Sequence, residues 1–534
     1  MNKRVFAWVA VGLMAAVASA NADPIKISGG LVSGAQLSDG AVRAYKGIPF
    51  AKPPIGDLRW REPQPAEPWS GTLAAETHRP VCMQPDPLGG NSIFTRLFFT
   101  PFEPRSEDCL YLNVWTTAAP GDKRPVMVWI PGGGFRGGSS AGAIYDGAEL
   151  AKKGVVLVSI NYRLWKFGFL ATSELSKESP HHVSGNYGLL DQIAALQWVK
   201  DNVAAFGGDP GNVTIFGQSA GASSANFLMA SPVAKGLFQK VIGESGGTFL
   251  PAATSSPIGR PMLGLAAAEA VGSKLTTDLK ATSLADLRKR SGDEILASPS
   301  DDVYQSALPI MDGYVLPATV AEIFTAGKQN DVPLLAGTNA NEGANFPTLK
   351  TLAAFREDAK KRIGSFADEY LSLYAADTDA QATEASAAAI RDTRIAWPNL
   401  RWATTQLKTG HSKVFYYYFP HHPPAPPNEQ FVENLGKNLG ASHGAELAYV
   451  FGNFIPSEWA WADADKTLAK TVSQYWVNFA TNGDPNGPGL PAWPTFNPDT
   501  NSVLRFDATI AAGPLPNQKL YAFWDKVAAA WKDQ

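Results

Sequence analysis

The pentapeptide Gly217-Gln218-Ser219-Ala220-Gly221 has the residue types and spacing for nucleophilic catalysis. Residues 212–216 before it are β-branched and aromatic, which predicts a buried strand, and residues 222–229 after it predict a helix. A G-x-S-x-G pattern between a strand and a helix predicts a sharp turn that exposes the serine hydroxyl. The start of the helix also favours negative charge beside that hydroxyl. Ser219 is therefore a candidate catalytic nucleophile.

A serine hydroxyl is a weak nucleophile until a base accepts its proton, and that base needs an acid to orient it. Of the seven histidines, His443 is a candidate base because it lies in a loop of small residues, 440–445, from which a ring can project. Glu342 and Asp312 both follow apolar runs, so the spacing leaves both open as the acid. Two histidine pairs in polar and proline-rich loops are expected at the solvated surface rather than at a metal: His181 with His182, and His421 with His422.

The elements that must position these side chains are predicted by the hydrophobic pattern. Continuous apolar runs at 125–130, 155–160 and 332–337 are typical of strands buried on both faces. Helical spacing in residues 186–202 predicts a helix between such strands. Strands that alternate with helices predict an α/β fold with a mostly parallel central sheet flanked by helices. Residues 260–305 and 350–412 are expected to form large helical excursions from that sheet.

Three consecutive glycines, 132–134, follow the strand predicted at 125–130. Glycines at the end of a strand allow a close approach of the backbone and leave its N–H groups accessible. A flexible loop is the alternative interpretation of the same residues.

Composition limits the classes of partner. The chain has 534 residues, of which 45% are hydrophobic, enough for a large core. The formal net charge is -3 and no basic run stands out, which argues against nucleic acid or an anionic membrane surface. No stretch reaches the length of apolar residues that a membrane span needs. Without an internal repeat or a linker, residues 23–534 are expected to form a single domain.

The N-terminus has the form of an export signal. Lys3 and Arg4 precede the apolar stretch 5–17, and small residues around Ala20 offer cleavage sites. Residues 1–22 are therefore predicted to be a secretory signal peptide, and the mature protein to be periplasmic or secreted. A buried N-terminal helix is the alternative. An even number of cysteines in an exported protein favours a disulfide between Cys82 and Cys109, with two separate buried thiols as the alternative.

The chain resembles the type-B carboxylesterases, a branch of the α/β-hydrolase fold that includes cholinesterases and bile-salt lipases. The resemblance runs from about residue 25 to the end of the chain. Five stretches carry it: EDCLYLNV at 107–114, GGGF at 132–135, GNYGLLDQ at 185–192, FGGDP at 206–210 and FGQSAG at 216–221. Together they are far more specific than any single motif.

The resemblance implies a Ser–Glu–His triad in that chain order, with Ser219 as nucleophile, Glu342 as acid and His443 as base. It places Asp312 in a turn that is not catalytic. The family oxyanion hole corresponds to the backbone N–H groups of Gly133, Gly134 and Ala220. Two further correspondences are implied: Ser245 lies beside the acid and the base, and Cys82 with Cys109 matches the first disulfide of the family.

The implied activity is hydrolysis of carboxylic esters through an acyl-enzyme intermediate, without a metal or a cofactor. Short to medium or aryl and alkyl esters are expected as small-molecule substrates. A long-chain lipase and a non-catalytic binding member of the fold are the alternatives. Choline esters are not expected. Cholinesterases have a tryptophan in this loop that faces the quaternary ammonium of the substrate, and the loop between Cys82 and Cys109 has none. Pro131 and Trp165 depart from the common family pattern, and the sequence leaves the natural ester, a lid function of this loop and the oligomeric state open.

Overall fold

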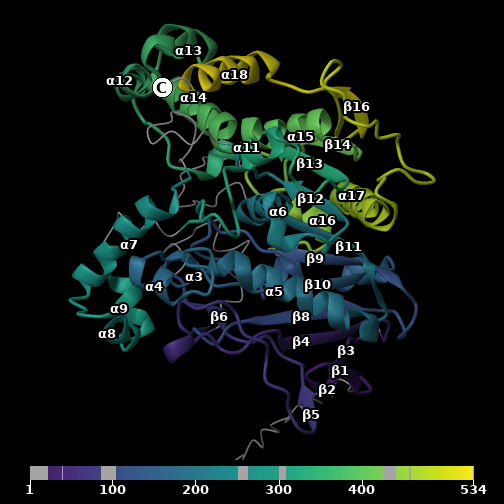
Figure 1. Ribbon diagram of the computed structural model, residues 1–534. Helices are drawn as coiled ribbons and strands as arrows, with labels where there is room; N and C mark the ends of the chain where they lie inside the picture. Colours follow the sequence, from purple (N-terminus) through teal and green to yellow (C-terminus); the bar gives the residue numbers. More distant parts are fainter. Residues whose placement is uncertain are drawn as a thin grey trace, which may run out of the picture.

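A large twisted sheet runs through the computed structural model, which describes residues 22–38, 40–85, 104–249, 262–299, 308–424, 440–455, 457 and 459–532 (Figure 1). Within these residues the sheet has 11 strands in the order β16-β15-β14-β13-β12-β11-β9-β10-β8-β4-β3. The strands are β3 (Ala35–Gln36), β4 (Arg43–Pro49), β8 (Tyr111–Thr116), β9 (Arg124–Ile130), β10 (Val156–Ile160), β11 (Gly208–Gln218), β12 (Lys240–Glu244), β13 (Leu334–Asn339), β14 (Val414–Phe419), β15 (Ser502–Arg505) and β16 (Ala511–Pro514).

The centre of the sheet is parallel and its edges are antiparallel. Strands β10, β9, β11, β12, β13, β14 and β15 pair in parallel, in that spatial order. Antiparallel pairs join β10 to β8, β8 to β4, β4 to β3 and β15 to β16. The predicted mostly parallel sheet is therefore confirmed. Because parallel strands carry the same polarity, the carboxyl ends of β11 to β14 lie along one edge, where ligands bind in such sheets.

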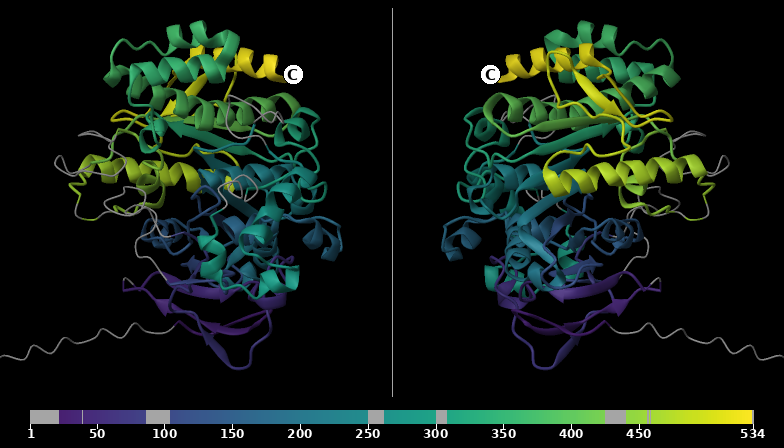
Figure 2. Two further views of the ribbon diagram at one scale, coloured as in Figure 1. Left: turned by 90° about the vertical axis from the view of Figure 1, so that its left-hand side faces the viewer. Right: turned by 90° about the vertical axis from the view of Figure 1, so that its right-hand side faces the viewer.

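Both faces of the sheet are buried, in agreement with the continuous apolar runs of its strands. In β9, Val126 and Val128 belong to one hydrophobic cluster and Met127 and Trp129 to another, as the alternation of side chains along a strand requires. Helices α5 (Tyr187–Asn202), α6 (Ala220–Ala230) and α15 (Trp397–Thr409) cover the first face. The other face is covered by α2 (Ala148–Lys152), α16 (Leu447–Phe451) and α17 (Asp463–Asn482), the last of which is the long yellow-green helix of Figure 2.

The predicted helical excursions are confirmed. The first consists of α7 (Leu265–Asp278), α8 (Leu284–Arg288) and α9 (Gly292–Ala297). The second consists of α12 (Leu352–Ile363), α13 (Ala367–Leu373) and α14 (Asp379–Arg391), beside the C-terminal α18 (Gln518–Lys532) at the top of Figure 1. The remaining named elements are β1 (Ile25–Ile27), β2 (Gly30–Ser33), β5 (Thr72–Ala74), β6 (Val81–Cys82), β7 (Arg105–Ser106), α3 (Trp165–Phe169), α4 (Ser173–Glu178) and α11 (Val320–Thr325).

Cys82 and Cys109 form a disulfide with their Cα atoms 5.0 Å apart. Residues 86–103 of the loop between them lie outside the described part of the chain, and so do residues 1–21 of the predicted signal peptide. Among the described helices, none is long and apolar enough to cross a membrane.

The turn between β11 and α6 lies directly against the end of β9. A Cβ atom at Gly217 would lie 2.6 Å from the carbonyl oxygen of Ile130, and one at Gly221 would overlap the same oxygen. Since backbone atoms cannot move aside as a flexible side chain can, only glycine allows this approach. The two glycines of the G-x-S-x-G pattern are therefore explained by packing between two parallel strands.

We expect Gly221→Ala to lower the free energy of unfolding by about 1–3 kcal/mol, because the methyl group displaces the end of β9. Urea denaturation followed by circular dichroism measures the change. Gly264→Ala is the matched control, because Gly264 has a negative φ of -75° and no atom within 4 Å of the added methyl position. Equal stability of the two variants would contradict the packing argument.

Candidate active site

Ser219 lies between β11 and α6 in a strained backbone conformation, with φ 59° and ψ -121°. A non-glycine residue rarely adopts this φ unless its surroundings hold it there. Its N–H donates to the carbonyl oxygen of Glu244 at the end of β12, at 2.9 Å, and its own carbonyl accepts from the N–H of Ser223, also at 2.9 Å. The predicted strand, sharp turn and helix are thus present around Ser219.

The loops after β13 and β14 bring Glu342 and His443 together. Asn341 forms a parallel bridge with Ser442, and its N–H donates to the carbonyl of Ala441 at 2.9 Å. The Nδ1 atom of His443 lies 2.6 Å from Oε2 of Glu342, and both side chains are buried. Because a carboxylate accepts, Nδ1–H is the donor in this bond, which leaves Nε2 of the ring as an acceptor.

Further hydrogen bonds fix both partners of this pair. Oε1 of Glu342 accepts from the backbone N–H of Asn339 at 2.6 Å. The side-chain amide of Asn345 donates to the carbonyl oxygen of His443 at 3.3 Å. The side-chain amide nitrogen of Gln218, the residue before Ser219, lies 3.2 Å from Nε2 of the imidazole. The candidate acid, base and nucleophile are thus linked through neighbouring residues along one sheet edge.

Two more buried carboxyl groups, those of Glu446 and Glu244, belong to the same region of the sheet edge. Glu446 accepts from the hydroxyl of Ser245 at 3.2 Å and from the side-chain amide of Asn339. Burial and the nearby charge of Glu342 raise the pKa of Glu446 to about 7. Glu244 accepts from the indole N–H of Trp476 at 2.6 Å, and burial together with the charge of Glu446 raises its pKa well above the usual value. Sequence reasoning missed both groups, although Glu446 follows His443 by three residues within an otherwise apolar segment.

The glycine-rich loop after β9 packs against Ser219. Gly133 and Gly134 have φ values of 114° and 65°, and the carbonyl of Gly133 accepts from the N–H of Gly137 at 3.1 Å. A Cβ atom at Gly132 would lie 3.3 Å from Cβ of Ser219. Pro131, which departs from the family pattern, uses its carbonyl to accept from the hydroxyl of Tyr162 at 2.9 Å.

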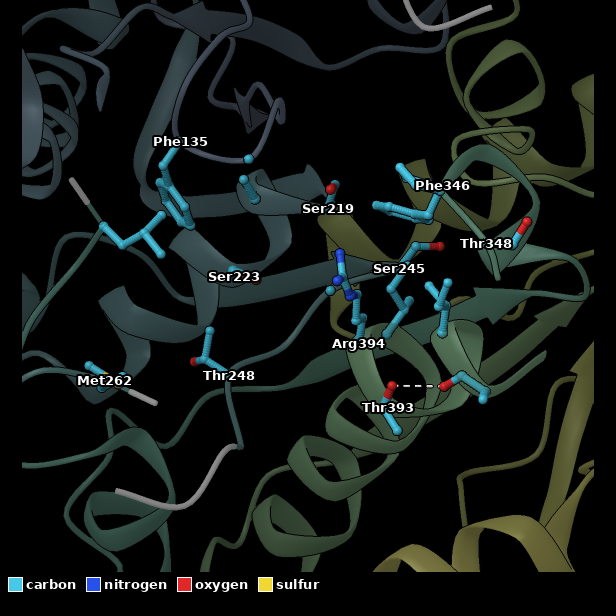
Figure 3. A pocket seen from close by; sticks show the side chains of 18 of the residues that line it. Phe135, Ser219, Ser223, Ser245, Thr248, Met262, Phe346, Thr348, Thr393 and Arg394 are labelled. Carbon is cyan, nitrogen blue, oxygen red and sulfur yellow. Dashed lines mark hydrogen bonds between the residues drawn. The ribbon is translucent and has the colours of Figure 1, made fainter. Parts of the chain in front are cut away.

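These elements surround a cavity of about 740 Å³. Ser219, Ser245 and Gly134 lie at its sheet edge, and helical segments supply the opposite wall (Figure 3). Most of the lining is apolar, as in small-molecule sites generally. The ring of Phe346 lines the cavity and lies 5.4 Å from the imidazole of His443. The cavity therefore has an apolar interior, and Ser219 lines it between Phe135 on one side and Phe346 on the other (Figure 3).

Asp312, the alternative acid, caps a turn. Its Oδ1 accepts from the N–H groups of Tyr314 at 3.0 Å and Leu316 at 2.9 Å. These bonds give Asp312 a local structural role.

The histidine pairs differ in their exposure. His181 and His182 are exposed as predicted. The prediction is wrong for His421, which is half-buried and has Nε2 2.8 Å from Oδ1 of Asp465 on α17. Within the described residues, no group of three or more His, Cys, Asp or Glu side chains is placed to hold a metal ion.

The raised pKa of Glu446 makes stability depend on pH. Because its folded-state pKa lies above the unfolded value, the folded protein binds the proton more tightly. The free energy of unfolding is therefore expected to fall as pH rises from the unfolded-state pKa of the carboxyl group to the folded-state pKa of about 7. In Glu446→Gln this fall is smaller, so the variant gains stability relative to wild type between about pH 5 and about pH 8.

Urea denaturation at both pH values measures this difference. Glu357→Gln is the control, since Glu357 is exposed on α12 and lies outside this carboxyl cluster. Parallel pH profiles of Glu446→Gln and wild type would contradict the assignment.

Comparison with known proteins adds the family. Residues 21–524 match the carboxylesterase family. The chain is 37% identical to fumonisin B1 esterase from Sphingopyxis macrogoltabida over 524 residues, which cover 95% of this chain and 91% of the relative. It is 36% identical to para-nitrobenzyl esterase from Bacillus subtilis (strain 168), with 89% and 93% coverage, and 33% identical to human cocaine esterase, with 92% and 88% coverage. The chain therefore belongs to the carboxylesterase family of the α/β-hydrolase fold and is a carboxylic ester hydrolase.

Proposed function

We propose that this hydrolase cleaves its esters through an acyl-enzyme intermediate, with Ser219 as nucleophile, His443 as base and Glu342 as the acid that orients the base. The observation that carries the proposal is the 2.6 Å bond between Glu342 and His443, at the same sheet edge as the strained Ser219. Chain order Ser–Glu–His agrees with the order that this fold uses.

In the first half-reaction the hydroxyl oxygen of Ser219 attacks the ester carbonyl while Nε2 of His443 accepts its proton. The negative charge that develops on the carbonyl oxygen is stabilised by the backbone N–H groups of Gly133, Gly134 and Ala220. The intermediate collapses to the acyl-enzyme, and the alcohol leaves with the proton from His443. Glu342 stabilises the imidazolium that exists between these two proton transfers.

In the second half-reaction water takes the place of the alcohol. His443 accepts a proton from the water as its oxygen attacks the acyl carbonyl, and the same N–H groups stabilise the oxyanion. Collapse releases the carboxylic acid and returns the proton to Ser219. All of these steps use side chains and backbone groups of this chain.

The cavity supports short to medium or aryl esters as substrates. Its volume of about 740 Å³ lies within the range of small-molecule sites. Aromatic side chains line it, including Phe135, Phe227 and Phe346. Such walls bind acyl chains or aromatic alcohols by burying apolar surface.

We also propose that residues 1–22 are a signal peptide and that residues 23–534 act as one domain in the periplasm or the medium. The disulfide between Cys82 and Cys109 supports an oxidising compartment.

Ser219→Ala tests the nucleophile. We expect kcat on p-nitrophenyl butyrate to fall by at least about 10⁴-fold, because no acyl-enzyme forms without the hydroxyl. The wild type is expected to show a burst of p-nitrophenol equal to the enzyme concentration. Ser223→Ala is the matched control, one helical turn away in the same cavity, and keeps most of the activity. A Ser219→Ala variant with unchanged kcat would disprove the assignment.

Acyl-chain preference tests the size of the substrate. Across p-nitrophenyl acetate, butyrate, octanoate and palmitate, we expect kcat/KM to peak at butyrate or octanoate, the short to medium acyl chains that we propose for the cavity. A maximum at palmitate, with a rate jump above its micelle concentration, would favour the lipase alternative. No turnover of any ester, with no labelling by a serine-directed organophosphate, would favour a binding member of the fold.

A further inference from the structure

Arg394 lies at an interruption in the helical wall of the cavity. The chain runs from α14 through a π-helical turn, Asp392–Ala396, directly into α15. Pro398 in the first turn of α15 has no N–H, and its ring would clash with the carbonyl of the residue four positions before it, which is Arg394. The wider π turn relieves this conflict, and such turns are frequent at functional sites.

The same helical run presents one face to the cavity. Its lining residues are Ser386, Ala389, Ile390, Thr393, Arg394 and Ile395, and all but the last follow helical spacing. Arg394 is exposed, whereas its neighbours Thr393 and Ile395 are buried. Figure 3 shows its side chain extending from the π turn toward Ser219. A guanidinium therefore stands in the space that an ester bound at Ser219 would occupy.

One aromatic ring connects this guanidinium to the candidate base. The Cζ atom of Arg394 lies 5.8 Å from the centre of the Phe346 ring, and the same ring lies 5.4 Å from the imidazole of His443. A cation over an aromatic face is attracted to it, which helps to orient the side chain. The guanidinium and the imidazole thus contact the same aromatic ring.

Few charged side chains line the described part of the cavity. Three charged side chains appear among the described residues that line it: Arg394, Arg362 and Asp358. Arg362 donates to Asp358 at 3.0 Å, so these two charges offset each other. Outside the cavity, the preceding cation of the same helix, Arg391, donates to the buried Asp392 at 2.7 Å. Among the described lining residues, Arg394 is the cation whose guanidinium lies over the ring of Phe346.

We propose that Arg394 determines specificity for esters that carry a second, ionised carboxylate. The planar guanidinium matches a carboxylate with two parallel hydrogen bonds and stays charged at every pH at which the enzyme works. The inference rests on the proposed role of Ser219, since it concerns a carboxylate on a substrate whose scissile carbonyl is held there.

Matched half-esters test the proposal. We compare p-nitrophenyl hydrogen adipate with p-nitrophenyl isooctanoate, in which an isopropyl group replaces the carboxylate. The wild type is expected to favour the adipate by kcat/KM after correction for each uncatalysed rate. In Arg394→Met the ratio of the two kcat/KM values falls on the order of 10- to 100-fold, and in Arg394→Lys it falls less. Added salt lowers the wild-type ratio because it screens the interaction.

A second pair identifies which part of the ester carries the charge. Butyrate esters of meta-hydroxybenzoate and of meta-isopropylphenol differ only in the group on the alcohol, a carboxylate in the first and an isopropyl group in the second. If Arg394→Met changes the ratio for the adipate pair alone, the carboxylate belongs to the acyl group. If it changes the ratio for the hydroxybenzoate pair alone, the carboxylate belongs to the alcohol.

Arg401→Met is the matched control. Arg401 lies on α15 two turns beyond Arg394, pairs with Asp525 and does not line the cavity. Its ratios are expected to equal those of wild type. The proposed specificity is wrong if Arg394→Met leaves both ratios unchanged, including the case in which it lowers kcat/KM equally for both substrates of each pair. Wild-type enzyme that hydrolyses neither neutral ester, and that no serine reagent labels, would overturn the proposed function instead.

Discussion

The turn between β11 and α6 can approach the end of β9 only through glycines, and this contact fixes the position of Ser219. From there the site is assembled strand by strand. The N–H of Ser219 bonds to Glu244 at the end of β12, and the N–H of Ser245, also at positive φ, bonds to Gly337 in β13. Beyond β13, Asn341 bonds to Ala441 after β14. Each candidate side chain is therefore held by the neighbouring strand, which is how a rigid sheet preorganises a reaction.

Electrostatics impose a second constraint on this edge, because three carboxyl groups are buried together. Glu342 faces the imidazole, and Glu446 and Glu244 belong to the same region of the sheet edge. Burial and like charge raise the pKa values of the latter two, which limits how much negative charge accumulates next to His443. The hydrogen bonds from Ser245 and Trp476 satisfy oxygens that would otherwise be buried without partners.

The sequence predicted the elements that depend on local pattern and missed what depends on contacts between distant segments. Apolar runs located the central strands, and the strand–turn–helix context located Ser219. Spacing alone could not separate Glu342 from Asp312. The difference between them is which of their loops pairs with residues after β14, and this contact between distant segments cannot be deduced from local spacing. The family resemblance supplied the choice. His421 was wrongly placed at the surface because its partner, Asp465, is on α17. No sequence pattern predicted that Arg394 lines the cavity, since the direction of its side chain depends on the π-helical turn before Pro398.

The two walls of the cavity come from different parts of the fold, the sheet edge and a helical excursion. Ser219, Glu342 and His443 follow strands whose packing fixes their positions, so a change there disturbs both stability and chemistry. The opposite wall comes from the helical excursion and the π turn that bears Arg394. A helix face can exchange one side chain without altering the sheet edge, because its backbone is held by its own hydrogen bonds. A side chain on that wall can therefore change while the sheet edge that bears Ser219 stays the same, as is general for folds that host many substrates.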